Sequence, residues 1–422
     1  MVKKTRQTMQ SRQIKQIIQI IQKETRKAEI FLIAGIIGAG IVLTGCAKKE
    51  TENIQTETGV KDSLAVEDAD HAPDWETMTV QDTMELRYAD QFSVEKYEDG
   101  YEKLVIGGSD TYLIVPEGEK DPEHIPDDVT VIHRPLSNIY LAATSAMDLF
   151  RSLDAVDLIT LSGTQESGWY IDEAKQAMES GAMVYAGKYS APDYELILSK
   201  SCDLAIESTM ISHSPEVKEQ LQKIGIPVLV ERSSYEKSPL GRMEWIKLYG
   251  VLTGKEEEAD RCFEEKAEEV EKIVTEEASG KTAAFFYISS NGYVNVRKPG
   301  DYISEMIRMA GGVPVPQNIE DNGNALSTMN MQMEAFYAEA KDADYLIYNS
   351  TIDGELENLS DFLAKSSLLS GFKAVKEGHV WCTGKNMFQE SMGLGDMILD
   401  MHRLFTQENP DPAQMKYLHL LR

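Results

Sequence analysis

The chain has 422 residues, with 42 Lys and Arg against 70 Asp and Glu, which gives a formal net charge of −28. Hydrophobic residues make up 42% and charged residues 27%, so the composition is that of a globular protein and excludes wholesale disorder. The acidic excess argues against nucleic acid as the main partner, because nucleic acid binding needs clustered Lys and Arg. Four Cys in a chain of this length do not form a disulfide framework.

The first 45 residues differ from the rest, because they carry eight basic and two acidic side chains. An apolar run at 30–44 follows, and its 15 residues are fewer than the ~20 that span a bilayer as a helix. It ends in Leu43-Thr44-Gly45-Cys46, which resembles the lipobox of bacterial lipoproteins. In that family the signal is cut before the Cys, which is then acylated. We expect a signal peptide at 1–45 and a lipid on Cys46, with an uncleaved N-terminal anchor as the alternative.

The next segment, 46–84, begins with a polar, acidic stretch that has few apolar residues and no periodicity, which predicts a disordered tether. Short alternating runs at 92–97, 103–106 and 111–116, with a turn at 98–100, then predict leading β-hairpins. The remaining cysteines, Cys202, Cys262 and Cys382, follow no metal-ligand spacing, so we expect free thiols and no metal site.

Apolar strands then alternate with helices in two series. In the first, we expect strands at 129–132, 158–161, 183–185, 204–206 and 228–230, with helices at 139–153, 170–179, 194–200 and 215–224. In the second, we expect strands at 282–288, 345–348 and 380–382, with helices at 302–310, 331–340 and 392–405. This alternation predicts an α/β fold with two Rossmann-like lobes, at 85–254 and 279–422, and a ligand cleft between them.

The segment 255–278 lies between the two series, is highly charged and contains neither Pro nor Gly. Its apolar residues recur in steps of three and four, which predicts one long amphipathic helix linking the lobes.

Several local patterns, in their order and spacing, resemble one family. They are RPLSNI at 134–139 with AATSA at 142–146, LTGKEEEA at 252–259, MAGG at 309–312 and FKAVKEGHVW at 372–381. The chain resembles the helical-backbone (class III) substrate-binding lipoproteins of ABC importers, which bind ferric siderophores, haem or cobalamin. The resemblance implies a monomer at the extracytoplasmic face of the bacterial cell membrane. Its partners would be an ABC permease dimer with a cytoplasmic ATPase, and its transported ligand would be a small metal chelate. The protein itself would hold no cofactor.

Two glutamates occupy matching places in a faint internal repeat of a short helix followed by a strand. In the family, one Glu at this place in each lobe docks on arginines of the permease. The resemblance therefore implies docking roles for Glu195 and Glu334. The alternative is that each Glu only complements the dipole of its helix.

Ligands of open α/β sheets bind beyond the carboxyl ends of the strands. The residues that follow the expected strands combine aromatic rings with cations, and such a set suits a large anionic metal complex. The candidate ligand-binding residues are Arg134, Trp169, Tyr170, Tyr189, Ser208, Arg232, Tyr235, Tyr293, Arg297, Asn349, Lys385 and Phe388.

The sequence contains no G-x-S-x-G elbow, Walker A motif or H-E-x-x-H, so we expect a binding protein and not an enzyme. A ferric siderophore or related iron complex is the expected ligand. Cobalamin, haem and an oxyanion such as molybdate remain open, as do a chelatase-like enzyme and a surface lipoprotein without a transport role.

Overall fold

A computed structural model describes residues 72–422 apart from 275, 318 and 320–326. The expected signal peptide, Cys46 and most of the expected tether lie outside the described residues. None of the helices in the described part of the chain is both long enough and apolar enough to cross a membrane.

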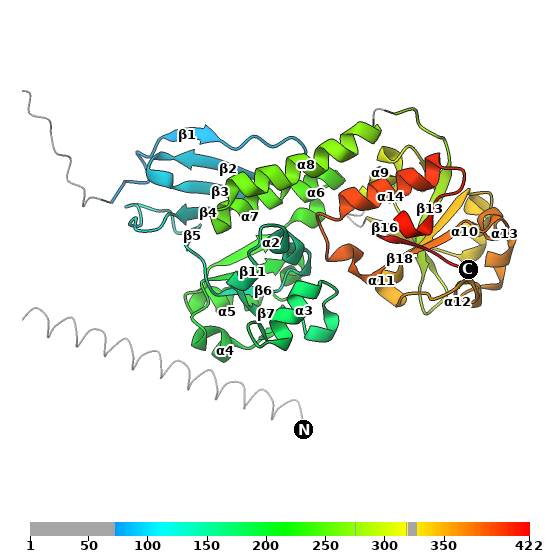
Figure 1. The fold of residues 1–422 in the computed structure, drawn as a ribbon. Coiled ribbons are helices and arrows are strands. Elements are labelled where there is room, and N and C mark those ends of the chain that lie inside the picture. Colours follow the sequence, from blue (N-terminus) through cyan, green and yellow to red (C-terminus); the bar gives the residue numbers. More distant parts are fainter. Residues whose placement is uncertain (1–71, 275, 318, 320–326) are drawn as a thin grey trace, which may run out of the picture. The chain divides into compact units, whose positions relative to one another are not determined.

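The chain first forms a five-stranded sheet, called here the leading sheet (Figure 1, blue to cyan). Its strands, in spatial order, are β1 (Val80–Thr83), β2 (Phe92–Tyr97), β3 (Glu102–Ile106), β4 (Asp110–Val115) and β5 (Val129–His133). The first four strands pair antiparallel, while β5 lies parallel to β4. Alternate residues such as Phe92, Val94 and Leu104 face the main core, which confirms the expected hairpins.

The expected tether is wrong at its C-terminal end, since residues 72–84 belong to the folded part. Strand β1 pairs with β2, and Trp75 and Met78 pack on Tyr101, Leu113 and Val115 at the other face of the leading sheet. Burial of these apolar side chains stabilises an ordered conformation in a segment whose composition alone predicted disorder.

The first lobe is a parallel sheet in the order β12-β11-β6-β7-β8. Its strands are β6 (Ile139–Leu141), β7 (Ile159–Ser162), β8 (Val184–Tyr185), β11 (Leu204–Ser208) and β12 (Val228–Glu231), and a small hairpin joins β9 (Gly187–Lys188) to β10 (Ala191–Pro192). Its helices are α2 (Met147–Ser152), α3 (Asp172–Glu179), α4 (Tyr194–Ser199) and α5 (Pro215–Lys223).

Two expectations for the first lobe are wrong. The strand at 129–132 is β5 of the leading sheet, and the first strand of the lobe is β6, inside the stretch expected to be a helix at 139–153. All three residues of β6 are buried, because a central parallel strand is covered on both faces. Such a strand reads as a short apolar run, which periodicity does not distinguish from a buried helix.

Three helices follow β12, namely α6 (Pro239–Glu244), α7 (Ile246–Thr253) and α8 (Glu256–Val274). The αL conformation of Gly254 ends α7, as is common where a helix stops at glycine. Helix α8 buries Ala259, Phe263, Ala267 and Val270 in the expected steps of three and four, and it ends at Val274, before the expected residue 278. It packs against α6 and α7 and also against the second-lobe helices α9 and α14.

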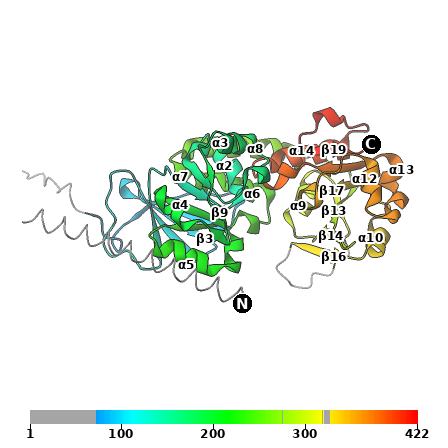
Figure 2. The ribbon, with the colours of Figure 1, turned by 90° about the horizontal axis from the view of Figure 1, so that it is seen from below.

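The second lobe is a mixed sheet in the order β16-β14-β13-β17-β18-β19, with β15 beside β13 (Figure 2). Strands β13 (Thr282–Ile288), β15 (Val313–Val315), β17 (Tyr345–Tyr348) and β18 (Val380–Thr383) run parallel, and β14 (Val294–Arg297), β16 (Thr328–Met331) and β19 (Leu418–Leu420) run antiparallel to their neighbours. Its helices are α9 (Tyr302–Met309), α10 (Met333–Ala340), α11 (Ser350–Asp353), α12 (Leu359–Ala364), α13 (Lys373–Glu377) and α14 (Leu394–Thr406).

The same hydrogen-bonding arrangement around an aspartate occurs in both lobes. Asp203, just before β11, accepts hydrogen bonds from the amides of Ser137 and Asn138, just before β6. Asp344, just before β17, accepts them from the amide and hydroxyl of Thr282 at the start of β13. Each carboxylate thus joins the amino ends of two neighbouring parallel strands, and the faint repeat in the sequence corresponds to equivalent places in the two sheets.

Candidate functional site

The loops at the carboxyl ends of β7 and β18 meet, so the two lobes contact each other at the predicted site. Gln389 follows η9 (Lys385–Phe388), and its side-chain amide donates to the carbonyl of Gly168 at 2.7 Å. The Gln389 side-chain carbonyl accepts from the amide of Tyr170 at 2.8 Å. The Lys385 ammonium lies 5.8 Å from the centre of the Tyr170 ring. Tyr170 from the first lobe and Lys385 from the second, both predicted ligand residues, are therefore brought together.

Further bonds join the same second-lobe segment to the first lobe. The Ser391 hydroxyl donates to the carbonyl of Ser145 at 2.8 Å, and the Met392 amide donates to the Asp148 carboxylate at 2.8 Å. Asp148 is fully buried, and burial raises its pKa although Arg151 beside it acts in the opposite direction. The chain between β18 and α14 is thus held against the first lobe at several points, which limits how far the lobes move apart at this place.

A second group of rings and cations lies where α6 of the first lobe packs on α9 of the second. The Arg297 guanidinium lies 5.5 Å from the ring centre of Phe388 and 3.7 Å from the Asp301 carboxylate. The Arg242 guanidinium stacks at 3.5 Å over the ring of Tyr302. Burial raises the pKa of Asp301, while Arg297 opposes that shift. Arg297 and Phe388, predicted from the sequence, are therefore neighbours.

Arg232 and Tyr235 form a third pair, directly after β12. The Arg232 guanidinium lies 4.7 Å from the ring centre of Tyr235, and the Tyr235 side chain is 52% exposed. Within the described ranges Arg232 makes no ion pair, and its Nε is buried without an acceptor. This pair is the first-lobe counterpart of Lys385 and Phe388, because both pairs follow the last parallel strand of their sheet.

Other predicted ligand residues have structural contacts. Trp169 is 1% exposed and donates to the Ser162 hydroxyl, and Asn349, also 1% exposed, caps α11 by accepting from Thr351. Ser208 accepts from the Met210 amide at the end of β11. Trp169 and Asn349 are thus buried, whereas Ser208 is half-buried.

Two tyrosines remain at the surface of loops. Tyr189 is half-buried between β9 and β10, and Tyr293 is 39% exposed at the β13–β14 turn.

The placement of Arg134 overturns the reason for which it was chosen. It follows β5, which belongs to the leading sheet and not to the sheet of the first lobe. Its guanidinium donates to the carbonyl of Val251 at 2.8 Å and pairs with Glu102 and Glu256 at 3.4 and 3.2 Å. Arg134 therefore joins the leading sheet to the start of α8, and its charge is already compensated.

Both predicted docking glutamates are exposed in the first turn of a helix, Glu195 on α4 and Glu334 on α10. Neither makes an ion pair within the part of the chain that the structure describes. Asp193 already caps α4 by accepting from the Leu196 amide, so Glu195 is not needed as the cap of this helix.

Sequence reasoning missed Gln389, Arg242 and Tyr302. Gln389 is the residue after Phe388, where the candidate segment was ended. Arg242 lies on α6, which the sequence signals through Ser238 followed by Pro239, a helix cap and a first-turn proline. Tyr302 opens a helix that was expected, but nothing local indicates its stacking partner.

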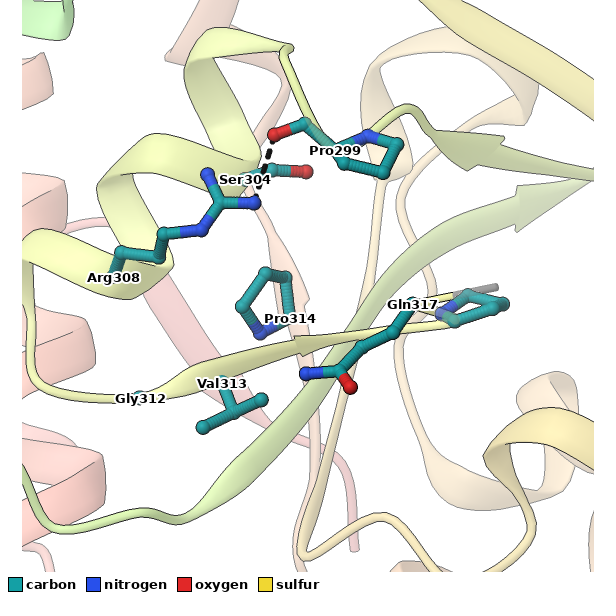
Figure 3. A pocket seen from close by; sticks show the side chains of 8 residues that line it. Pro299, Ser304, Arg308, Gly312, Val313, Pro314 and Gln317 are labelled. Atoms are coloured by element: carbon teal, nitrogen blue, oxygen red, sulfur yellow. Dashed lines mark hydrogen bonds between the residues drawn. The ribbon is translucent and has the colours of Figure 1, made fainter. Parts of the chain in front are cut away.

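A pocket of 350 Å³ lies in the second lobe, beside α9 (Figure 3). Its lining includes Ser304 and Arg308 of α9 together with Pro314 and Gln317, and Arg308 donates to the carbonyl of Pro299. None of the predicted ligand residues lines it. Across residues 72–422, as far as they are described, no group of three or more His, Cys, Asp or Glu side chains is arranged to hold a metal ion.

Comparisons with known proteins agree with this architecture. Two uncharacterized lipoproteins of Methanocaldococcus jannaschii are similar to the chain. One is 22% identical over 394 residues, which cover 87% of this chain and 90% of the relative, and the other is 24% identical over 369 residues, which cover 84% and 88%.

Among solved structures, the periplasmic haem-binding protein HutB of Vibrio cholerae aligns with a TM-score of 0.52 and 15% identity, over 63% of this chain and 98% of that one. A periplasmic haem-binding protein from Pseudomonas aeruginosa aligns with a TM-score of 0.52 and 15% identity, over 68% and 97%. These likenesses show a shared two-lobed α/β fold. The sequence profile of the family described as periplasmic binding protein matches residues 148–387, more than half of the chain and wholly beyond the leading sheet. The chain therefore belongs to the periplasmic binding protein family.

Proposed function

We propose that this chain is the substrate-binding component of an ABC importer, which captures a ferric siderophore or a related iron complex at the extracytoplasmic face of the membrane. The observation that carries the proposal is the meeting of Tyr170 and Lys385, from different lobes, at the carboxyl ends of their sheets. Ligands of open α/β sheets bind at this edge, and the two lobes supply a ring and a cation to the same place.

The charges at this edge favour an anionic ligand. Arg232 and Lys385 have no carboxylate partner among the described residues, in contrast to Arg134, which pairs with Glu102 and Glu256. An unpaired cation beside an exposed aromatic ring suits carboxylate, hydroxamate or catecholate oxygens carried on a flat, partly apolar ligand. Haem, with its propionates, fits the same description.

The mechanism is capture without covalent chemistry. The ligand is bound by side chains of both lobes, and Gln389 with Ser391 and Met392 holds the loops of the two lobes together. The loaded protein then docks on the permease, and ATP hydrolysis in the cytoplasm drives transfer. No side chain of this chain needs to exchange a proton with the ligand.

A binding panel on the full chain in detergent tests the ligand class. Intrinsic Trp fluorescence is titrated with a ferric hydroxamate, a ferric catecholate, haemin, cobalamin and molybdate. Trp169, next to exposed Tyr170, is the expected reporter. Saturable quenching by one class identifies the cargo. Saturable binding of none would refute capture of these ligands and favour a chelatase-like or a non-transport surface role.

Docking through Glu195 and Glu334 is tested separately from binding. The double variant Glu195→Ala with Glu334→Ala is expected to bind ligand like the wild type and to lose uptake, because both carboxylates pair with cations of the permease. The control is Glu216→Ala with Glu339→Ala, which removes the same charge from exposed sites on α5 and α10. Normal uptake by the first double variant would refute the docking assignment.

A further inference from the structure

The turn between β3 and β4 of the leading sheet lies against the side chain of Arg232. Gly107 in this turn has a φ of +61°, and a Cβ built on it would lie 2.8 Å from the Arg232 Nε and 2.9 Å from its Cζ. Real Cβ atoms do not approach other heavy atoms so closely. The bare backbone of Gly107 is therefore what leaves room for the guanidinium in its observed place.

A chain of hydrogen bonds holds this turn in register with the segment that carries Arg232. The Gly107 amide donates to the carbonyl of Gln91 at 2.8 Å, and the Gln91 amide donates to the Glu236 carboxylate at 3.0 Å. Glu236 is 2% exposed, also accepts from the Trp245 indole at 2.9 Å, and lies four residues after Arg232. The position of the turn relative to Arg232 is thus fixed by hydrogen bonds that lead to the buried Glu236 carboxylate and does not depend on the turn alone.

The guanidinium also lies over the Tyr235 ring, at 4.7 Å from the ring centre. Arg232 is clamped between the leading sheet and its own loop, yet it has no anionic partner within the described part of the chain. Holding a partly desolvated cation without a counter-charge is unfavourable, and an anionic group that binds to it forms charge-assisted hydrogen bonds. A guanidinium that is held in place and has no counter-charge is suited to bind an anionic group of a ligand.

We infer that the leading sheet is part of the ligand site, and that Gly107 positions the Arg232 guanidinium to bind a carboxylate or catecholate group of the ligand. This inference rests on the proposed function. Gly107 is a positioning residue, because it acts through Arg232 and does not itself meet the ligand. The leading sheet lies outside the part of the chain that the family profile matches, so this would be a contribution added to the two lobes.

The geometry is tested without any ligand. Phenylglyoxal reacts with exposed guanidinium groups, and its rate of reaction at Arg232 is followed by peptide mass spectrometry in the wild type, Gly107→Ala and Gly108→Ala. Both glycines have positive φ, +61° and +73°, so alanine introduces similar backbone strain, but a Cβ at Gly108 would meet nothing within 4 Å. We expect Arg232 to react several-fold faster in Gly107→Ala only. Equal rates in the two variants would overturn the inference.

The role in binding is tested by a double-mutant cycle with whichever panel compound binds, haemin being the first probe. Arg232→Gln is expected to weaken binding about 10- to 150-fold, the equivalent of the 1.5–3 kcal/mol of a hydrogen bond to a charged group. Gly107→Ala is expected to weaken it less, and to have no further effect in the Arg232→Gln background. An undiminished effect in that background would overturn the positioning role. If no panel compound binds the wild type, anion recognition falls with the proposed function, and the phenylglyoxal rates still decide whether Gly107 positions Arg232.

Discussion

Removing the Gln389 side chain should loosen the contact between the two lobes at the predicted ligand site. Gln389 makes two hydrogen bonds to the first lobe, at 2.7 Å to the Gly168 carbonyl and at 2.8 Å from the Tyr170 amide. Each is worth about 0.5–1.5 kcal/mol net, so Gln389→Ala should favour opening of this contact by roughly 1–3 kcal/mol. That free energy corresponds to a change of about 5- to 150-fold in the opening equilibrium.

Hydrogen exchange of the full chain, read by mass spectrometry on peptides that cover 163–170, measures this change directly. The Tyr170 amide loses its acceptor in Gln389→Ala and should exchange faster by the factor given above. The control is Gln407→Ala, which truncates an exposed glutamine just beyond α14. Exchange at Tyr170 that stays at the wild-type rate would refute the view that Gln389 joins the lobes.

Three further predictions concern single side chains. Burial alone would raise the pKa of Asp344, but hydrogen bonds from Lys373 and Thr282 lower it to about 2. Its contribution to folding is therefore complete above about pH 4 and is lost as the pH falls through about 2. Asp344→Asn should lower the free energy of unfolding in urea by about 2 kcal/mol at pH 7 and much less at pH 2, and an equal loss at both pH values would contradict this. Burial raises the pKa of Glu207, whose two carboxylate oxygens have no partner, from 4.5 to about 8. The wild type should lose stability as the pH rises from about 4.5 to 8, and Glu207→Gln should lack this loss, a relative gain of at most about 3 kcal/mol at pH 7, whereas parallel pH profiles would contradict it. The mature wild type should begin at a lipid-modified Cys46, as read by mass spectrometry of its N-terminal peptide, and an N-terminal peptide that still carries residues 1–45 would favour an uncleaved anchor.

Strands and helices with clear local signals were predicted close to their observed bounds. Strands β13 and β17 begin and end where expected, because each is a run of apolar and aromatic residues preceded by polar residues. The amphipathic α8 was also expected, although its end lies four residues earlier, at Val274. Strand β6 was missed, since its three buried residues carry no periodicity of their own.

The sequence predicted which of the candidate ligand residues lie close together only in part. Tyr170 with Lys385, Arg297 with Phe388, and Arg232 with Tyr235 are neighbours in the structure, as the rule on carboxyl ends of strands implies. Trp169 was chosen by the same rule and yet is buried, because the direction of a side chain in a loop depends on what packs above it. Nothing in the local sequence announces the contact between Gly107 and Arg232, which lie in different sheets.

The family resemblance, the alternation of strands and helices, and the residues that follow each strand could be predicted from the sequence, because these depend on short-range patterns of apolar, turn and charged residues. The sequence did not predict that β5 joins the leading sheet and not the first lobe, nor that Arg134 pairs with Glu102 and Glu256. Strand pairing and ion pairs of this kind join residues far apart in the chain. Their partners are selected by the packing of whole helices and strands against one another. A local sequence pattern carries little information about this packing energy.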